Sequence, residues 1–70
     1  MTFQPNQKVE FIKDFKIMEG VSLGETIDAG QQAIIIDPYR NSRNVLVPHR
    51  YWVMTLAGAA AVPESYMKGL

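Results

Sequence analysis

The segment from Tyr39 to Trp52 combines cationic and aromatic side chains. It carries three arginines and no acidic residue. Guanidinium groups bind carboxylates and phosphates, and exposed aromatic rings beside arginine are typical of binding surfaces. The segment could therefore contact a protein or a nucleic acid. The predicted contact residues are Tyr39, Arg40, Arg43, Arg50, Tyr51 and Trp52, together with the loop around Met18.

The other reactive side chains form no catalytic or metal-binding pattern. His49 is the only histidine and cysteine is absent, so neither a thiolate metal site nor a Cys–His nucleophile pair can form. The serines lack a nucleophile motif, and Glu25 and Asp28 are interpreted as solvated turn residues. No glycine-rich loop leads into a helix that could hold a phosphate. We expect no enzymatic activity, cofactor or metal, unless several chains assemble a site together.

The charges limit the choice of partner. Seven basic and seven acidic residues give a formal net charge of zero. This balance argues against a general polyanion binder, because affinity for nucleic acid rests largely on basic residues that neutralise phosphates. The basic residues of segment 39–44 have another interpretation, in which a soluble charged loop keeps two apolar strands from pairing with other chains.

Length and composition predict one small folded domain. A chain of 70 residues buries only about 60% of its unfolded surface and cannot support two cores. Hydrophobic residues at 47% and charged residues at 20% are typical of a folded chain. Without cysteine, its stability must come from packing or self-association. We predict an arm in residues 1–7, a β-rich domain in residues 8–62, and a tail or short helix in residues 63–70.

The first half of the chain predicts a strand, a loop and a turn. Residues 8–12 alternate polar and apolar side chains, which is the period of a half-buried strand with Val9 and Phe11 inward. Residues 14–25 have no steady period and predict a long, partly packed loop, which is uncommon in a small domain unless it has a function. The sequence of residues 28–30, Asp-Ala-Gly, predicts a turn.

A hairpin with a long basic tip is predicted next. Residues 33–36 are β-branched after an alanine, and their lack of alternation predicts a strand buried on both faces. Residues 37–44 are rich in turn formers, and residues 45–47 resume the apolar run. We place Val45 and Val47 of this second strand in the interior, together with Val53 further along the chain.

We expect Pro48 to end that strand. Beyond it, residues 52–56 favour a further strand because aromatic and β-branched side chains dominate, whereas the following alanines favour a looser or helical course. Residues 63–68 could form one helical turn that begins with proline. Because side chains alternate along an extended chain, Tyr51 and Trp52 are expected on opposite faces, with only one of them exposed.

This order of elements resembles a small Src-homology-3-like β-barrel of four to five strands. Residues 11–15 are similar to the Ala-Leu-Tyr-Asp-Tyr segment of that family, residues 24–30 to its diverging turn, and residues 48–53 to its late Pro-Ser-Asn-Tyr-Val segment. The resemblance covers residues 8–56. Near Ile35 the chain lacks the tryptophan with which the family grips proline-rich ligands, so the resemblance implies an architecture and no ligand.

Together these features predict a small non-enzymatic protein-binding module, a regulator or inhibitor that occupies a partner's surface. One alternative is nucleic-acid binding through the basic hairpin tip, with Tyr39 or Tyr51 stacking on bases. Another is a self-associating structural subunit, indicated by the apolar stretch 53–62. That stretch is about half as long as a membrane-spanning helix, and the N-terminus lacks a secretory signal pattern. We therefore expect a cytoplasmic protein without a membrane partner.

Overall fold

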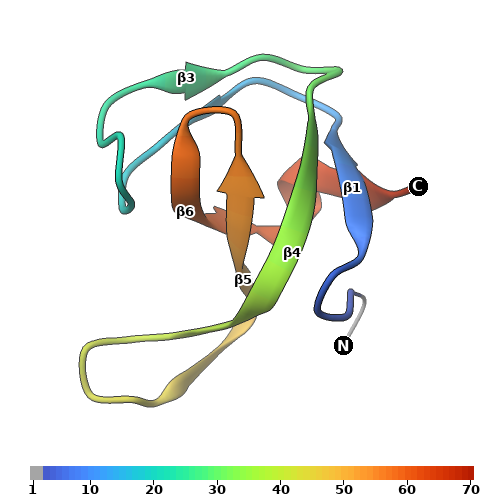
Figure 1. Cartoon of the computed structure of the whole chain (residues 1–70). Helices are drawn as coiled ribbons and strands as arrows, with labels where there is room; N and C mark the ends of the chain where they lie inside the picture. The colour runs from blue at the N-terminus through green and yellow to red at the C-terminus, as the bar shows by residue number, and fades with distance from the viewer. Residues whose placement is uncertain (1–2) are drawn as a thin grey trace.

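The computed structural model describes residues 3–70, and its regular structure is mainly antiparallel β (Figure 1). The elements are β1 (Lys8–Phe11), β2 (Phe15–Lys16), β3 (Thr26–Ile27), β4 (Gln32–Arg40), β5 (Leu46–Thr55), β6 (Gly58–Pro63), the 3-10 helix η1 (Glu64–Tyr66) and β7 (Met67–Gly69). Five strands form one sheet in the order β6-β5-β4-β1-β7, and β2 pairs with β3 in a second sheet. The prediction of a mainly β fold is confirmed. Within residues 3–70 the outer strands β6 and β7 are not hydrogen-bonded to each other, so the larger sheet does not close into a barrel.

One hydrophobic core lies on what we call the inner face of the larger sheet. In β1, Val9 and Phe11 are fully buried, as predicted, while Lys8 and Glu10 lie on the opposite, outer face. Burying each large apolar side chain stabilises the fold by about 1.5–3 kcal/mol. The core consists of Phe3, Val9, Phe11, Phe15, Ile17, Ile27, Ala33, Ile35, Tyr51, Val53, Ala60, Val62 and Met67.

Strand β4 alternates in burial, contrary to the expectation that both of its faces are buried. Ala33 and Ile35 are buried in the core, whereas Ile34 and Ile36 are exposed on the outer face. The run of β-branched residues indicated a strand correctly, because such side chains fit a pleated sheet. It did not indicate what covers the second face, and no segment of residues 3–70 buries Ile34 or Ile36.

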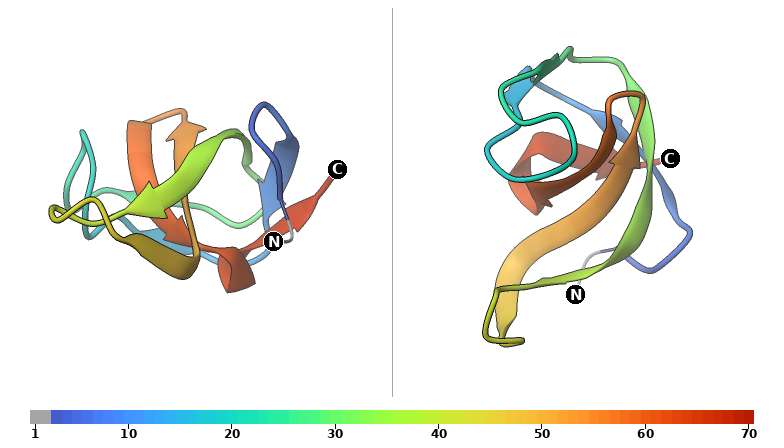
Figure 2. Two further views of the ribbon diagram at one scale, coloured as in Figure 1. Left: turned by 90° about the horizontal axis from the view of Figure 1, so that it is seen from below. Right: turned by 60° about the vertical axis from the view of Figure 1, so that its left-hand side comes forward.

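Strand β5 runs through Pro48 instead of ending there. Pro38 pairs with Tyr51 and Arg40 with Leu46, so one intervening residue of β4 lies opposite four of β5. This irregular segment, residues 47–50, tolerates a proline because regular ladder bonds are interrupted there, and His49 adopts a positive φ of 61° within it. Val53 is buried as predicted, but Val45 is 55% exposed and Val47 only half-buried. Both lie on the distal part of the β4–β5 hairpin, residues 40–47, which we call the hairpin arm and which extends away from the body (Figure 2).

The alanine-rich residues form strand β6, so the expectation of a looser or helical course was wrong. Six residue pairs join β5 and β6, from Arg50–Pro63 to Thr55–Gly58. On its other edge, β6 is hydrogen-bonded to the long loop that follows β1. The Val21 amide donates to the Ala59 carbonyl at 2.9 Å, and Gly20 forms a β-bridge with Ala60. The small side chains allow this close approach, which outweighs the helix propensity of alanine.

The long loop after β1 is partly packed, as predicted. Phe15 and Ile17 are buried in the core, while Met18, Val21 and Leu23 are exposed. The predicted turn at residues 28–30 is present, with Gly30 at a φ of 93°. The Ala29 amide donates to a carboxylate oxygen of Asp14 at 2.9 Å, which ties this turn back to the start of the loop.

Both ends of the described chain belong to the same body. Phe3, in the segment predicted as an arm, is buried and its ring lies 5.4 Å from that of Tyr51. The predicted turn at residues 63–68 is realised only as η1 over residues 64–66. It is followed by β7, which the sequence did not indicate and which pairs with β1.

Candidate functional site

The six predicted contact residues separate into three groups. Tyr51 lies in the core with 1% of its surface exposed, and Trp52 is half-buried on the outer face, so the prediction of opposite faces is confirmed. Arg40 and Arg43 are exposed on the hairpin arm. Tyr39 and Arg50 come together with Trp52.

An extra residue in β4 explains this grouping. Ile35 pairs with Val53 and Asp37 with Trp52, so Ile36 is an extra residue, a β-bulge. Beyond a bulge the alternation of faces is reversed relative to an unbroken strand. Asp37 and Tyr39 therefore share the outer face with Trp52, and Tyr39 lies outside the main core although it is only 6% exposed.

Tyr39, Trp52, Arg50 and Glu19 form a compact group, which we call the outer cluster. The ring centroids of Tyr39 and Trp52 lie 5.4 Å apart at a tilt of 57°, and the Arg50 guanidinium carbon lies 6.0 Å from the Tyr39 centroid. Such aromatic and cation–π geometries are attractive. The Tyr39 hydroxyl donates a hydrogen bond to a Glu19 carboxylate oxygen. This bond, with burial and the negative charge of Glu19, raises the pKa of Tyr39 above its ordinary value, an effect that Arg50 partly opposes.

The tip of the hairpin is ordered by its own side chains. The Asn41 side-chain oxygen accepts hydrogen bonds from the backbone amides of Arg43 at 2.9 Å and Val45 at 3.1 Å. Arg40 donates from Nη1 to the Asn44 carbonyl at 3.1 Å. Two groups that a nucleic-acid interface would use, the Asn41 side-chain oxygen and the Tyr39 ring, therefore already make contacts within the chain.

Sequence reasoning missed a group of exposed apolar side chains on the outer face of β4 and β5 and in the turn after β5. Ile34 (43% exposed), Ile36 (40%), Met54 (49%) and Leu56 (83%) form what we call the apolar face. Ile34 and Met54 are directly paired across β4 and β5. A period-two reading of residues 33–36 would have placed Ile34 and Ile36 on one face, but the continuous apolar run hid that alternation.

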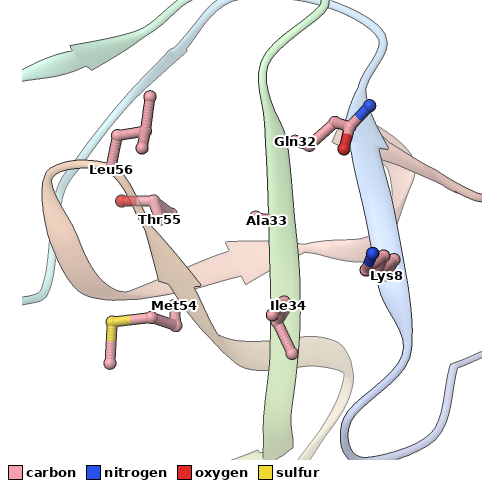
Figure 3. A pocket seen from close by; sticks show the side chains of 7 residues that line it. All are labelled: Lys8, Gln32, Ala33, Ile34, Met54, Thr55 and Leu56. Carbon is pink, nitrogen blue, oxygen red and sulfur yellow. The ribbon is translucent and has the colours of Figure 1, made fainter.

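Polar side chains border the apolar face. Lys8 pairs with Ile34 on the β1 side, and Lys8 and Gln32 line a shallow pocket of about 270 Å³ together with Ile34, Met54 and Leu56. Figure 3 shows Met54 and Leu56 to one side of β4, with Gln32 and Lys8 to the other. A second hollow, of about 380 Å³, lies beside Trp52 and is lined by Asp37, Pro38, Arg40 and Trp52.

His49 lies apart from this surface. Its Nδ1 is 3.1 Å from Oε1 of Glu64, whose other carboxylate oxygen is 3.4 Å from the Tyr51 hydroxyl. Among residues 3–70, no three His, Asp or Glu side chains converge as a metal site requires. The same residues contain no helix that is long and apolar enough to cross a membrane.

Comparison with known proteins returns no match: no protein family, curated protein or solved structure is significantly similar to this chain.

Proposed function

We propose that this chain is a small non-enzymatic protein-binding module, a regulator or inhibitor that acts by occupying another protein's surface through the apolar face. The single observation that carries this proposal is the grouping of Ile34, Ile36 and Met54 on two neighbouring strands with Leu56 in the turn after β5, all of them at least 40% exposed. Contiguous exposed apolar side chains with a polar border mark protein contact sites, because burying them against a partner removes them from water.

The outer cluster adds an anchor to this surface. Trp52 follows the same face as Met54, two positions away along β5, and its ring is held by Tyr39. Tryptophan and arginine are enriched among the residues that carry most of the binding energy at interfaces. Of the predicted contact residues, Trp52 therefore borders the apolar face. Arg40 lines the hollow beside Trp52, and Arg50 lies against Tyr39, whereas Arg43 belongs to the tip of the hairpin arm.

We also propose the Src-homology-3-like architecture in an open form. The sheet order β6-β5-β4-β1-β7, the long loop after β1 and the 3-10 helix before the last strand support this likeness. The likeness concerns architecture, and the proposed function rests on the residues of the outer face.

Affinity capture with paired baits tests the proposal. The double variant Ile34→Asp/Met54→Asp places two charges on the apolar face, while Leu23→Asp places one on an exposed loop position that is 69% exposed. We expect the wild-type protein and Leu23→Asp to retain a partner that the double variant loses, and calorimetry with the purified partner to show the same order. Equal capture by all three baits, or no capture together with a monomeric chain, would overturn the proposal.

A titration with labelled single- and double-stranded DNA and RNA at two salt concentrations distinguishes the nucleic-acid alternative from the protein-binding proposal. Binding through Arg40 and Arg43 would weaken steeply with salt and disappear in Arg40→Ala/Arg43→Ala. We expect no binding at low salt. Salt-sensitive binding that needs both arginines would favour the nucleic-acid alternative over the protein-binding proposal.

A further inference from the structure

We infer that the protein covering the apolar face is a second copy of this chain, packed against it across a two-fold axis. This inference rests on the proposed function, since it names the partner of the same surface. The charges that flank the apolar face carry it, because their arrangement complements itself.

The interface must extend beyond the apolar side chains. The four residues of the apolar face together expose on the order of 200 Å² of apolar surface. This area follows from the usual burial energy of such side chains and the usual energy per unit of apolar area. The smallest stable interfaces bury about 600 Å² per partner. Any protein that covers the apolar face therefore also covers its border, including Lys8 and Asp37.

Lys8 and Asp37 are opposite charges on two sides of the apolar face. Lys8 lies directly beside Ile34 on the neighbouring strand, and Asp37 follows Ile36 along β4 and shares the outer face with Trp52. Both are exposed. The two ion pairs of the described residues join His49 to Glu64 and Lys68 to Glu10, so neither Lys8 nor Asp37 has an ionic partner within residues 3–70.

A two-fold axis brings these two charges together. In a two-fold interface, if residue i of the first copy contacts residue j of the second, then residue j of the first copy also contacts residue i of the second. A two-fold axis that lies parallel to the face, over the region of Ile34 and Ile36 and midway between Lys8 and Asp37, places each Lys8 opposite the partner's Asp37 and each apolar face against its equivalent. The formal net charge of zero leaves no overall repulsion between the copies.

Dimerisation also suits a chain of this size. A domain of 70 residues without disulfides gains little stability from a single small core, and self-association is one of the ways in which such chains are stabilised. Any other protein that binds the apolar face must then compete with the second copy.

Sedimentation of the purified, untagged protein over a concentration series tests the inference. We expect the wild type to form dimers. Lys8→Glu and Asp37→Lys should each raise the dimer dissociation constant by roughly tenfold or more, because each turns two attractive contacts into two like-charge contacts. Lys8→Glu/Asp37→Lys should return it to within about threefold of wild type, since the reversed pairs attract again. Lys16→Glu and Asp28→Lys are matched controls, exposed charges on β2 and on the turn near β3, and should leave it unchanged.

Mixing the two single variants gives the sharpest result. In a mixed dimer both flanking pairs carry opposite charges, so Lys8→Glu with Asp37→Lys should associate more tightly than either variant does alone. All these substitutions are at exposed positions, and circular dichroism verifies that the variants are folded.

Three outcomes overturn the inference: a monomer at every concentration, a dimer indifferent to both reversals, and a mixture no tighter than its components. A monomeric chain that nevertheless loses a captured foreign protein in Ile34→Asp/Met54→Asp would refute the second copy and leave the proposed function intact. A monomer that captures nothing refutes both.

Discussion

Tyr39 reaches its position because β4 contains one extra residue. Without the bulge at Ile36, the strand's alternation would turn Tyr39 toward the inner face. With the bulge, the Tyr39 ring packs at a tilt against Trp52, and its hydroxyl donates to Glu19. The outer cluster thus joins the hairpin of β4 and β5 to Glu19 of the long loop, which lies 20 positions before Tyr39 in the sequence.

The hydrogen bond to Glu19 makes Tyr39 sensitive to high pH. Because the bond favours the protonated phenol, the folded-state pKa lies above the ordinary value of 10.0. A raised pKa contributes stability that is fully present below the unfolded value and is lost as pH rises through the folded value. We expect the ultraviolet absorbance of phenolate to show one tyrosine titrating later than free tyrosine, and the free energy of unfolding to fall above pH 10.0.

Two variants test whether Tyr39 and its bond to Glu19 cause the late titration and the loss of stability at high pH. Tyr39→Phe should remove the late transition and flatten the loss of stability at high pH, while Glu19→Gln, which keeps an acceptor but removes the negative charge, should shift the transition toward the ordinary pKa. If the late transition persists in Tyr39→Phe, it belongs to another tyrosine and the bond to Glu19 is not formed in solution.

At the scale of residues, the sequence correctly predicted which side chains face the core wherever the strand alternates strictly. Val9, Phe11 and Val53 were placed correctly in the core, and Tyr51 and Trp52 on opposite faces. Tyr39 could not be placed, since the types of residues 33–39 do not indicate where a bulge interrupts the count. Val45 was misplaced because an apolar residue on an arm beyond the core has nothing to bury it.

In the long loop after β1, Ile17 packs into the core whereas the neighbouring Met18 lies on the surface. Ile17 is fully buried, while Met18 is 71% exposed. We expect Ile17→Ala to lower the free energy of unfolding by about 2–5 kcal/mol. Met18→Ala should change it by no more than about 0.5 kcal/mol. Urea unfolding of both variants measures the difference, and equal effects would show that the loop is not packed.

The same loop approaches β6 at Gly20. A Cβ atom at this position would lie 2.8 Å from the Ala60 Cα and closer still to the Ala59 carbonyl oxygen, both of them backbone atoms that cannot move aside cheaply. We expect Gly20→Ala to destabilise the fold by about 1–3 kcal/mol, as overpacking does. Leu23→Ala, at an exposed position of the same loop, is the control for urea unfolding. An unchanged stability in Gly20→Ala would mean that the loop does not pair with β6.

At the scale of elements, local signals indicated strands and turns but not their partners. The turn at residues 28–30 and the hairpin of β4 and β5 follow from glycine and from turn-forming residues. Strand β6 does not, because the alanines prefer a helix and only pairing with β5 on one side and Gly20 on the other holds them extended. Pro48 was likewise predicted to end the strand. The strand continues because the hydrogen-bond ladder between β4 and β5 is already interrupted at residues 47–50, where a proline is tolerated.

The outer face of the whole molecule has a polar half and an apolar half. Across β7, β1 and the start of β4 it carries Lys68, Glu10, Lys8 and Gln32, and across β4 and β5 it carries the apolar face. This division depends on strand order and register, which pair residues far apart in the sequence, such as Glu10 with Lys68. The candidate site could not be predicted from the sequence for that reason, although Trp52, one of the six predicted contact residues, lies two positions from Met54 on the same face of β5.

Dimerisation through this face would couple stability to concentration. Raising the protein from near its dimer dissociation constant to about 100 times that value should stabilise each chain by on the order of 1 kcal/mol, because association draws on the folded state alone. Thermal unfolding at a series of concentrations measures this. The midpoint should rise for wild type and stay constant for Ile34→Asp/Met54→Asp; a midpoint independent of concentration in both would contradict the dimer.

Trp52 has an optical consequence. It is the only tryptophan in the chain, and it lies half-buried beside the apolar face instead of in the core. Its fluorescence therefore reports on one surface: when a protein covers that surface, water leaves the indole and the emission should shift to shorter wavelength. The natural sequence thus carries its own label for every binding experiment on this face, with no dye attached.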